Sequence, residues 1–150
     1  MSDELVPVQV VGVGRDPFGN DFVLLRDHRD RSLPIWIGEC EAVAIHLKLE
    51  GRDMPRPMTH DLLLNIIRRL NAEVLHLTID DLWQSTFYAK LVLQVGEEKI
   101  EIDCRPSDGI AIALRANAPI YVVDDVMEEG KWTGETREES GEESDEESEE

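Results

Sequence analysis

Short β-rich runs alternate with runs of helical spacing along this chain. The pattern predicts strands at residues 5–13, 21–27, 32–38, 73–80, 85–95, 98–104 and 119–123. It predicts helices at residues 39–51, 59–70 and 106–118. The second helix would begin with Thr59 as its N-cap and Asp61 in its first turn. Its apolar stripe would consist of Leu62, Leu63, Ile66, Ile67 and Leu70.

The order of three strands and a helix occurs twice, and a shift of 67 residues moves the first set onto the second. At this shift Ile35 falls on Ile102, and Glu41 falls on Asp108. We therefore predict an α+β fold, in which two β-β-β-α repeats joined by the helix within residues 56–70 form a single domain. Its mixed or antiparallel sheet would pack on the helices. Chance similarity between two segments of like pattern is the alternative to an internal duplication.

The chain is strongly acidic, with 33 acids, 15 bases and a net charge of −18 in 150 residues. Residues 135–150 hold ten acids and one base, so this segment contributes −9 and the remaining residues contribute the other −9. Such a segment buries too little apolar surface to order, so we predict a domain at residues 1–128 and a disordered acidic tail at residues 129–150. An acidic body with 4 Lys among its 14 bases suggests a halophilic, salt-adapted protein. An ordinary acidic protein with an acidic tail is the alternative.

Other features of the sequence indicate the cellular compartment in which the protein is found. No apolar run reaches the roughly 20 residues that cross a bilayer, so we expect no membrane partner. The N-terminal segment lacks the basic and apolar regions of a signal peptide. Cys40 and Cys104 have no metal-type spacing and are expected to be free structural thiols. Together these features predict a cytoplasmic protein.

Three carboxylates and one histidine are candidates for chemistry. Glu41 and Asp108 each lie in the first turn of a helix that follows a strand. If the two halves pack about a pseudo-two-fold axis, these carboxylates converge and would hold a divalent ion or divide acid and base roles. His60 is a candidate general acid or base, and its neighbour Asp61 is a further candidate metal ligand. A favourable interaction with the helix dipole is the alternative explanation for each carboxylate.

Basic residues indicate where a phosphate would bind. Arg105 precedes the helix at residues 106–118, and its guanidinium would form an anion site with the helix N-terminus and Ser107. Arg56 belongs to a cluster of arginines around the second helix on an otherwise acidic chain. The alternatives are an ion pair between Arg105 and a nearby aspartate, and solvated arginines on the helix surface.

Four segments together resemble the bifunctional nuclease domain family. They are LPIWIGECEAVAIHLKLEG, RPMTHDLL, STFYAKLVL and IDCRPSDGIAIALR with PIYV, and they extend from Leu33 to Val122. The resemblance implies hydrolysis of DNA and RNA. The polar residues of these motifs are Glu41, Thr59, His60, Asp61, Thr86, Tyr88, Arg105, Ser107 and Asp108. Met58, Cys104 and Gly109 stand where the resemblance leads us to expect Leu, Ala and Ala.

The candidate roles follow from these residues. The catalytic candidates are Glu41, His60, Asp61 and Asp108, and the phosphate-binding candidates are Arg56, Arg105 and Ser107. The candidate ligands of Mg²⁺ or Mn²⁺ are Glu41, Asp61 and Asp108. We expect His60 to be accessible to solvent and close to Arg105 and a carboxylate. DNA or RNA would bind weakly, because the net charge repels a polyanion. The alternative function is a non-catalytic binding or regulatory domain, whose motif residues hold the fold or a homo-oligomer contact.

Overall fold

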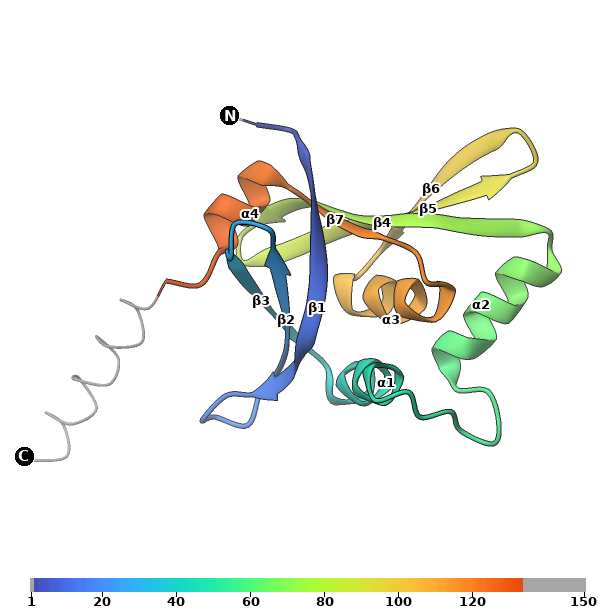
Figure 1. Cartoon of the computed structure of the whole chain (residues 1–150), viewed down its shortest axis with the longest axis horizontal. Helices are drawn as coiled ribbons and strands as arrows, with labels where there is room; N and C mark the ends of the chain where they lie inside the picture. The colour runs from blue at the N-terminus through green and yellow to red at the C-terminus, as the bar shows by residue number, and fades with distance from the viewer. Residues whose placement is uncertain (1, 134–150) are drawn as a thin grey trace, which may run out of the picture.

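The computed structural model describes residues 2–133. The first half contains β1 (Leu5–Arg15), β2 (Asp21–Asp27), β3 (Ser32–Ile37) and α1 (Glu39–Leu49) (Figure 1). After α2 (Thr59–Arg69), the second half contains β4 (Ala72–Trp83), β5 (Thr86–Val95), β6 (Glu98–Cys104) and α3 (Pro106–Ala116). The chain continues through β7 (Ile120–Val123) and α4 (Asp124–Gly130). The predicted order of strands and helices is confirmed, and α4 is an addition to it.

The strands of the described residues form one sheet in the order β3-β2-β1-β7-β4-β5-β6. Each half is an antiparallel meander, and β7 lies between the halves, antiparallel to β1 and parallel to β4. The helix α3 packs against β4 and β5, α2 packs against β4, and α1 packs against β1 and β2 (Figure 1). This arrangement confirms the α+β fold with a mixed sheet packed on helices.

The two halves have matching element boundaries. A shift of 67 residues moves both ends of α1 onto the ends of α3, because 39 plus 67 is 106 and 49 plus 67 is 116. The strands of the two halves also pair in the same order and direction. An internal duplication remains a prediction, and superposition of the halves would test it.

The centre of the core is α3, which packs against α1, α2 and the sheet. Ile110 and Ala113 of this helix are fully buried. Gly109 allows a close approach to β4, because a Cβ at this position would overlap the Leu77 side chain and press on the sulfur of Cys104. Both cysteines are free thiols, as predicted. Burial raises the pKa of the Cys104 thiol to about 11.

The apolar stripe predicted for α2 is wrong. Four of its five residues are between 38% and 71% exposed, namely Leu62, Leu63, Ile66 and Leu70. The buried positions are instead His60 and Leu64, and Ile67 is partly buried. The apolar residues of this helix form one broad side, and the buried positions His60 and Leu64 lie at its edge, so their spacing does not fix which part of that side turns inward. Polar contacts of its first turn, described below, hold the helix in the observed orientation.

The helix α4 extends past the predicted domain boundary at residue 128 and packs on the sheet through Val126 and Met127, which are buried. The amide of Trp132 then donates a hydrogen bond of 2.7 Å to the carbonyl of Ser32. The rest of the predicted tail, residues 134–150, lies outside the described residues. None of the helices within residues 2–133 has the length and apolar character of a membrane span.

Candidate active site at three helix N-termini

His60 and Asp108 meet between the first turns of α2 and α3. The Nε2 atom of His60 lies 2.9 Å from Oδ1 of Asp108. The expected proximity of His60 to a carboxylate is therefore confirmed. The expected solvent access is wrong, since His60 is 5% exposed. The reason is that His60 lies four residues before Leu64, on the buried face of α2.

Arg105 joins the carboxylates of both halves. Its Nη2 atom donates to Oε1 of Glu41 and to Oδ2 of Asp108, each at 2.8 Å, and its Nε donates to the same Asp108 oxygen at 3.1 Å. The predicted convergence of Glu41 and Asp108 is thus observed, around a guanidinium. Gly38 makes room for it, because a Cβ there would overlap the Glu41 carboxylate. The Arg105 side chain is 69% exposed, and its Nη1 makes no hydrogen bond to a described residue.

The protonation of this network follows from its contacts. Burial alone would raise the pKa of Asp108, but the hydrogen bonds from His60 and Arg105 outweigh burial and hold the pKa below its ordinary value. An ionised carboxylate only accepts, so Nε2 of His60 is the donor, and Nδ1 of the neutral ring carries no proton. Within the described residues, the one enclosed side-chain polar atom without a partner is Asp80 Oδ1. The Nδ1 atom of His60 also makes no hydrogen bond to a described residue, but it is not among the enclosed atoms. It is therefore in contact with solvent, although the rest of the side chain is buried.

Asp61 forms an ion pair with the C-terminal end of α3, whereas Asp108 lies at the N-terminal end of that helix. Its carboxylate accepts from the amide of Met58 at 2.9 Å and from Nε of Arg115 at 2.6 Å. Met58, and not Thr59 as predicted, is the N-cap residue of α2. Arg115 has a side chain that is 6% exposed, and it also donates to the carbonyls of Ala111 and Ala44. Sequence analysis missed Arg115, and the one available signal was a cation in the last turn of an apolar helix.

Two hollows meet at Arg105. A groove of about 890 Å³ lies between α1, α2 and β6, and its lining includes Glu41, His60, Asp108 and Arg105. A pocket of about 580 Å³ adjoins it, and Arg105 and Ser107 contribute to its lining. Of the three predicted phosphate-binding residues, Arg105 and Ser107 thus lie at the site. Arg56 lines neither hollow and lies in the loop before α2.

The residues proposed for a divalent ion do not fit one in this arrangement. Arg105 bridges Glu41 and Asp108, and Asp61 is paired with Arg115, so an ion would have to displace two guanidinium groups. No group of three or more His, Cys, Asp or Glu side chains in residues 2–133 is arranged to bind a metal. We therefore assign no step of a reaction to a metal ion.

The fold and the site define a class of protein: an α+β domain in which a histidine–aspartate pair and an arginine bridge lie at helix N-termini. Residues 23–134 match the bifunctional nuclease domain, and the chain belongs to this family. An uncharacterised protein of Mycobacterium tuberculosis is 44% identical over 124 residues, which cover 81% of this chain and 74% of that protein.

The relatives that carry the family name are longer. Bifunctional nuclease 1 of Oryza sativa subsp. japonica is 31% identical over 101 residues, which cover 65% of this chain and 30% of the rice protein. Bifunctional nuclease 2 of Arabidopsis thaliana is 28% identical over 93 residues, which cover 60% of this chain and 28% of the plant protein. The likeness to these plant proteins is therefore a likeness to one part of each.

Proposed function

We propose that this chain hydrolyses phosphodiester bonds of DNA and RNA, with His60 as the general base. The observation that carries the proposal is the 2.9 Å contact between His60 and Asp108, beside the exposed guanidinium of Arg105. A histidine oriented by a carboxylate can activate water, and a neighbouring cation can stabilise the charge on a phosphate. Membership of a family named for nuclease activity supports the reaction class.

In the proposed step, Nδ1 of His60 takes a proton from water while the water oxygen attacks phosphorus. The bond from phosphorus to the leaving oxygen breaks, and the leaving oxygen takes up the proton held by the histidine. Asp108 orients the ring through Nε2 and stabilises the imidazolium. Arg105 binds a non-bridging oxygen of the phosphate through Nη1. Glu41 acts through Arg105 as a positioning residue, because it accepts from Nη2.

The variant that tests the base is His60→Gln. A glutamine keeps an amide N–H near the position of Nε2, so the contact with Asp108 is retained while the base is lost. We expect hydrolysis of single-stranded DNA and RNA to fall by about 10²- to 10⁴-fold. The melting midpoint should stay near that of the wild type. His28→Gln is the matched control, since His28 is exposed and lies outside both hollows.

Two further measurements complete the test. Arg105→Lys keeps the charge but loses the fork of donors, so we expect a raised KM. Because the proposed step involves no metal ion, hydrolysis should persist after chelation of Mg²⁺. A His60→Gln protein that melts like the wild type and retains its rate would refute the proposed base.

The second candidate is a non-catalytic binding or regulatory domain, and the exposed apolar face of α2 favours it. Leu62, Ile66 and Leu70 are 52%, 47% and 71% exposed, which is unusual for one helix face of a monomer. In this case we expect no hydrolysis by the wild type. We also expect a homo-oligomer that Ile66→Lys dissociates in sedimentation experiments. Active monomers would count against this candidate.

A further inference from the structure

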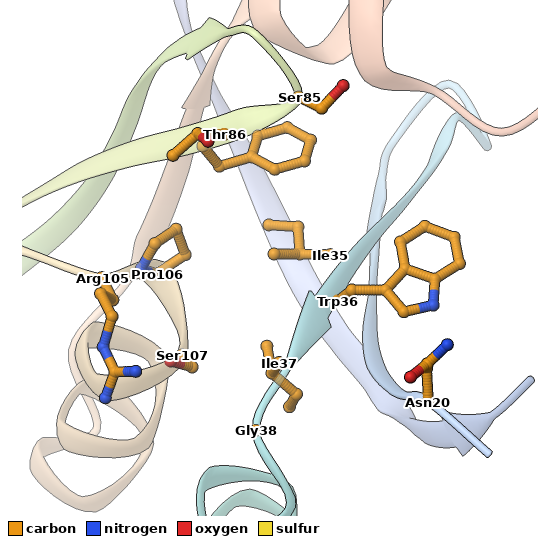
Figure 2. A pocket seen from close by; sticks show the side chains of 11 residues that line it. Asn20, Ile35, Trp36, Ile37, Gly38, Ser85, Thr86, Arg105, Pro106 and Ser107 are labelled. Carbon is orange, nitrogen blue, oxygen red and sulfur yellow. The ribbon is translucent and has the colours of Figure 1, made fainter.

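The pocket that adjoins the groove at Arg105 is a separate feature of the site. Figure 2 shows Ile35 and Ile37 on one side of it, and Arg105, Pro106 and Ser107 at the start of α3 on the other. Ser85 in the turn between β4 and β5 and Thr86 at the start of β5 also line the space. A volume of about 580 Å³ lies within the range of about 300–1,000 Å³ typical of small-ligand pockets.

The charge of the pocket differs from that of the chain. Among its eleven lining residues, Arg105 is the one charged residue, and none is acidic. The whole chain, in contrast, has a net charge of −18. Glu41 and Asp108 pair with Arg105, but they line the groove and not this pocket, so the pocket presents the guanidinium without a carboxylate and favours an anionic ligand.

Ser107 supplies a second and independent indication. This residue is 5% exposed and lines the pocket, yet its hydroxyl makes no hydrogen bond to a described residue. The hydroxyl oxygen is not among the enclosed atoms that lack a partner in the described residues, so it is open to the pocket and available to a ligand. Ser107 also lies in the first turn of α3, an eleven-residue helix whose N-terminal amides favour an anion.

We propose that this pocket binds one unpaired nucleotide next to the scissile phosphate of single-stranded DNA or RNA. This inference rests on the proposed function and adds the substrate class. The phosphate of the nucleotide contacts Nη1 of Arg105 and the hydroxyl of Ser107. Its base lies against the apolar wall of Ile35, Ile37 and Phe87, where the Phe87 ring offers a surface for stacking. A paired base is held in its duplex and does not enter, so single strands are selected.

Binding can be measured without turnover by the fluorescence of Trp36, which lies at the rim of the pocket (Figure 2). Phenylalanine replaces Trp83 and Trp132, which do not line the pocket, in the full chain. The probes are adenosine 5′-monophosphate, adenosine and inorganic phosphate. We expect the monophosphate to bind more tightly than either of its parts, because it engages both the apolar wall and the anion site.

The variant Ser107→Ala should weaken binding of the monophosphate by about tenfold, the loss of one hydrogen bond to a charged group. Ser32→Ala is the matched control, since Ser32 lies on β3 outside the pocket. Thr86 is exposed at the pocket mouth, so Thr86→Glu and Thr86→Lys give a second pair whose folding should be unaffected. We expect the glutamate to weaken binding and the lysine to preserve it.

The outcomes separate this inference from the proposed function. Monophosphate binding that depends on Ser107 and on the charge at position 86 supports the pocket, even in a protein without hydrolysis. Hydrolysis that depends on His60, together with binding that neither Ser107→Ala nor Thr86→Glu changes, overturns the pocket and leaves the function standing. Equal rates on single and double strands would also overturn it.

Discussion

The variant Asp61→Ala tests whether the first turn of α2 serves the fold or the chemistry. Asp61 accepts the Met58 amide at 2.9 Å and the Arg115 guanidinium at 2.6 Å, and the latter side chain is 6% exposed. Alanine removes both interactions and leaves the buried cation of Arg115 without its carboxylate. We therefore expect a loss of stability, with a smaller effect on the reacting groups around His60.

The magnitude follows from the two contacts. Loss of a helix cap costs about 1 kcal/mol. Removal of one partner from a buried ion pair costs about 3–5 kcal/mol. The Asp61 side chain is 37% exposed, so water replaces part of the interaction. We reduce the cost of the ion pair to roughly 2 kcal/mol for this reason. The sum of about 3 kcal/mol lowers the melting midpoint by roughly 12 °C in a domain of this size.

Thermal and urea unfolding of the variants measure this loss. Asp61→Asn keeps an acceptor for the Met58 amide but loses the charge, so it should lose roughly 2 kcal/mol and thereby separates the two contributions. Asp53→Ala is the control, since Asp53 is exposed in the loop before α2 and has no ion pair among the described residues. An Asp61→Ala protein that melts like the wild type but no longer hydrolyses nucleic acid would refute the structural role.

Three further outcomes are expected. The melting midpoint should rise between 0.1 and 2 M KCl, because salt screens repulsion among the excess acids; a flat or falling series would contradict the salt-adapted interpretation. The pKa of Asp108 is lowered in the folded protein, so its ionised carboxylate stabilises the fold at pH values above the pKa that aspartate has in the unfolded chain. This stabilisation is lost as the pH falls through the folded pKa. Urea titrations should therefore show that Asp108→Asn destabilises the protein more at pH 7 than at pH 3. Gly109→Ala should cost about 1–3 kcal/mol by crowding Leu77 and Cys104. Adding Cys104→Ala should recover part of that loss, and strict additivity in the double-mutant cycle would contradict this.

The fold could be predicted largely from local patterns. Strand alternation and helix spacing located the elements because most of them bury one face against the sheet. The exposed face of α2 could not be predicted, since Leu62 and Ile66 place apolar side chains on one side of the helix and Leu64 places one on another. The short helix α4 was missed for a related reason. Its sequence is acidic, and Met127 becomes fully buried only when β3 and β4 lie beside it.

Part of the site could also be predicted. The shift of 67 residues made Glu41 and Asp108 equivalent, and the structure brings them together. The shift does not indicate that Arg105 lies between them, because that contact depends on how the two helix N-termini approach in three dimensions. The ion pair of Asp61 with Arg115 could not be predicted from the sequence either, since 54 residues separate its partners. The sequence therefore predicted which groups are candidates, and the packing of α1, α2 and α3 determined their partners.

An acidic protein that acts on nucleic acid needs a site whose local charge differs from the charge of the whole chain. With a net charge of −18, this chain repels a polyanion over a Debye length of about 10 Å in 0.1 M salt. Within the site the local charge differs from that of the whole chain. Arg105 pairs with the carboxylates of Glu41 and Asp108 and still has Nη1 available to bind a phosphate. The adjoining pocket adds the Ser107 hydroxyl and no acidic side chain. On the proposed function, long-range attraction contributes little to binding, and short-range contacts with one unpaired nucleotide select the substrate.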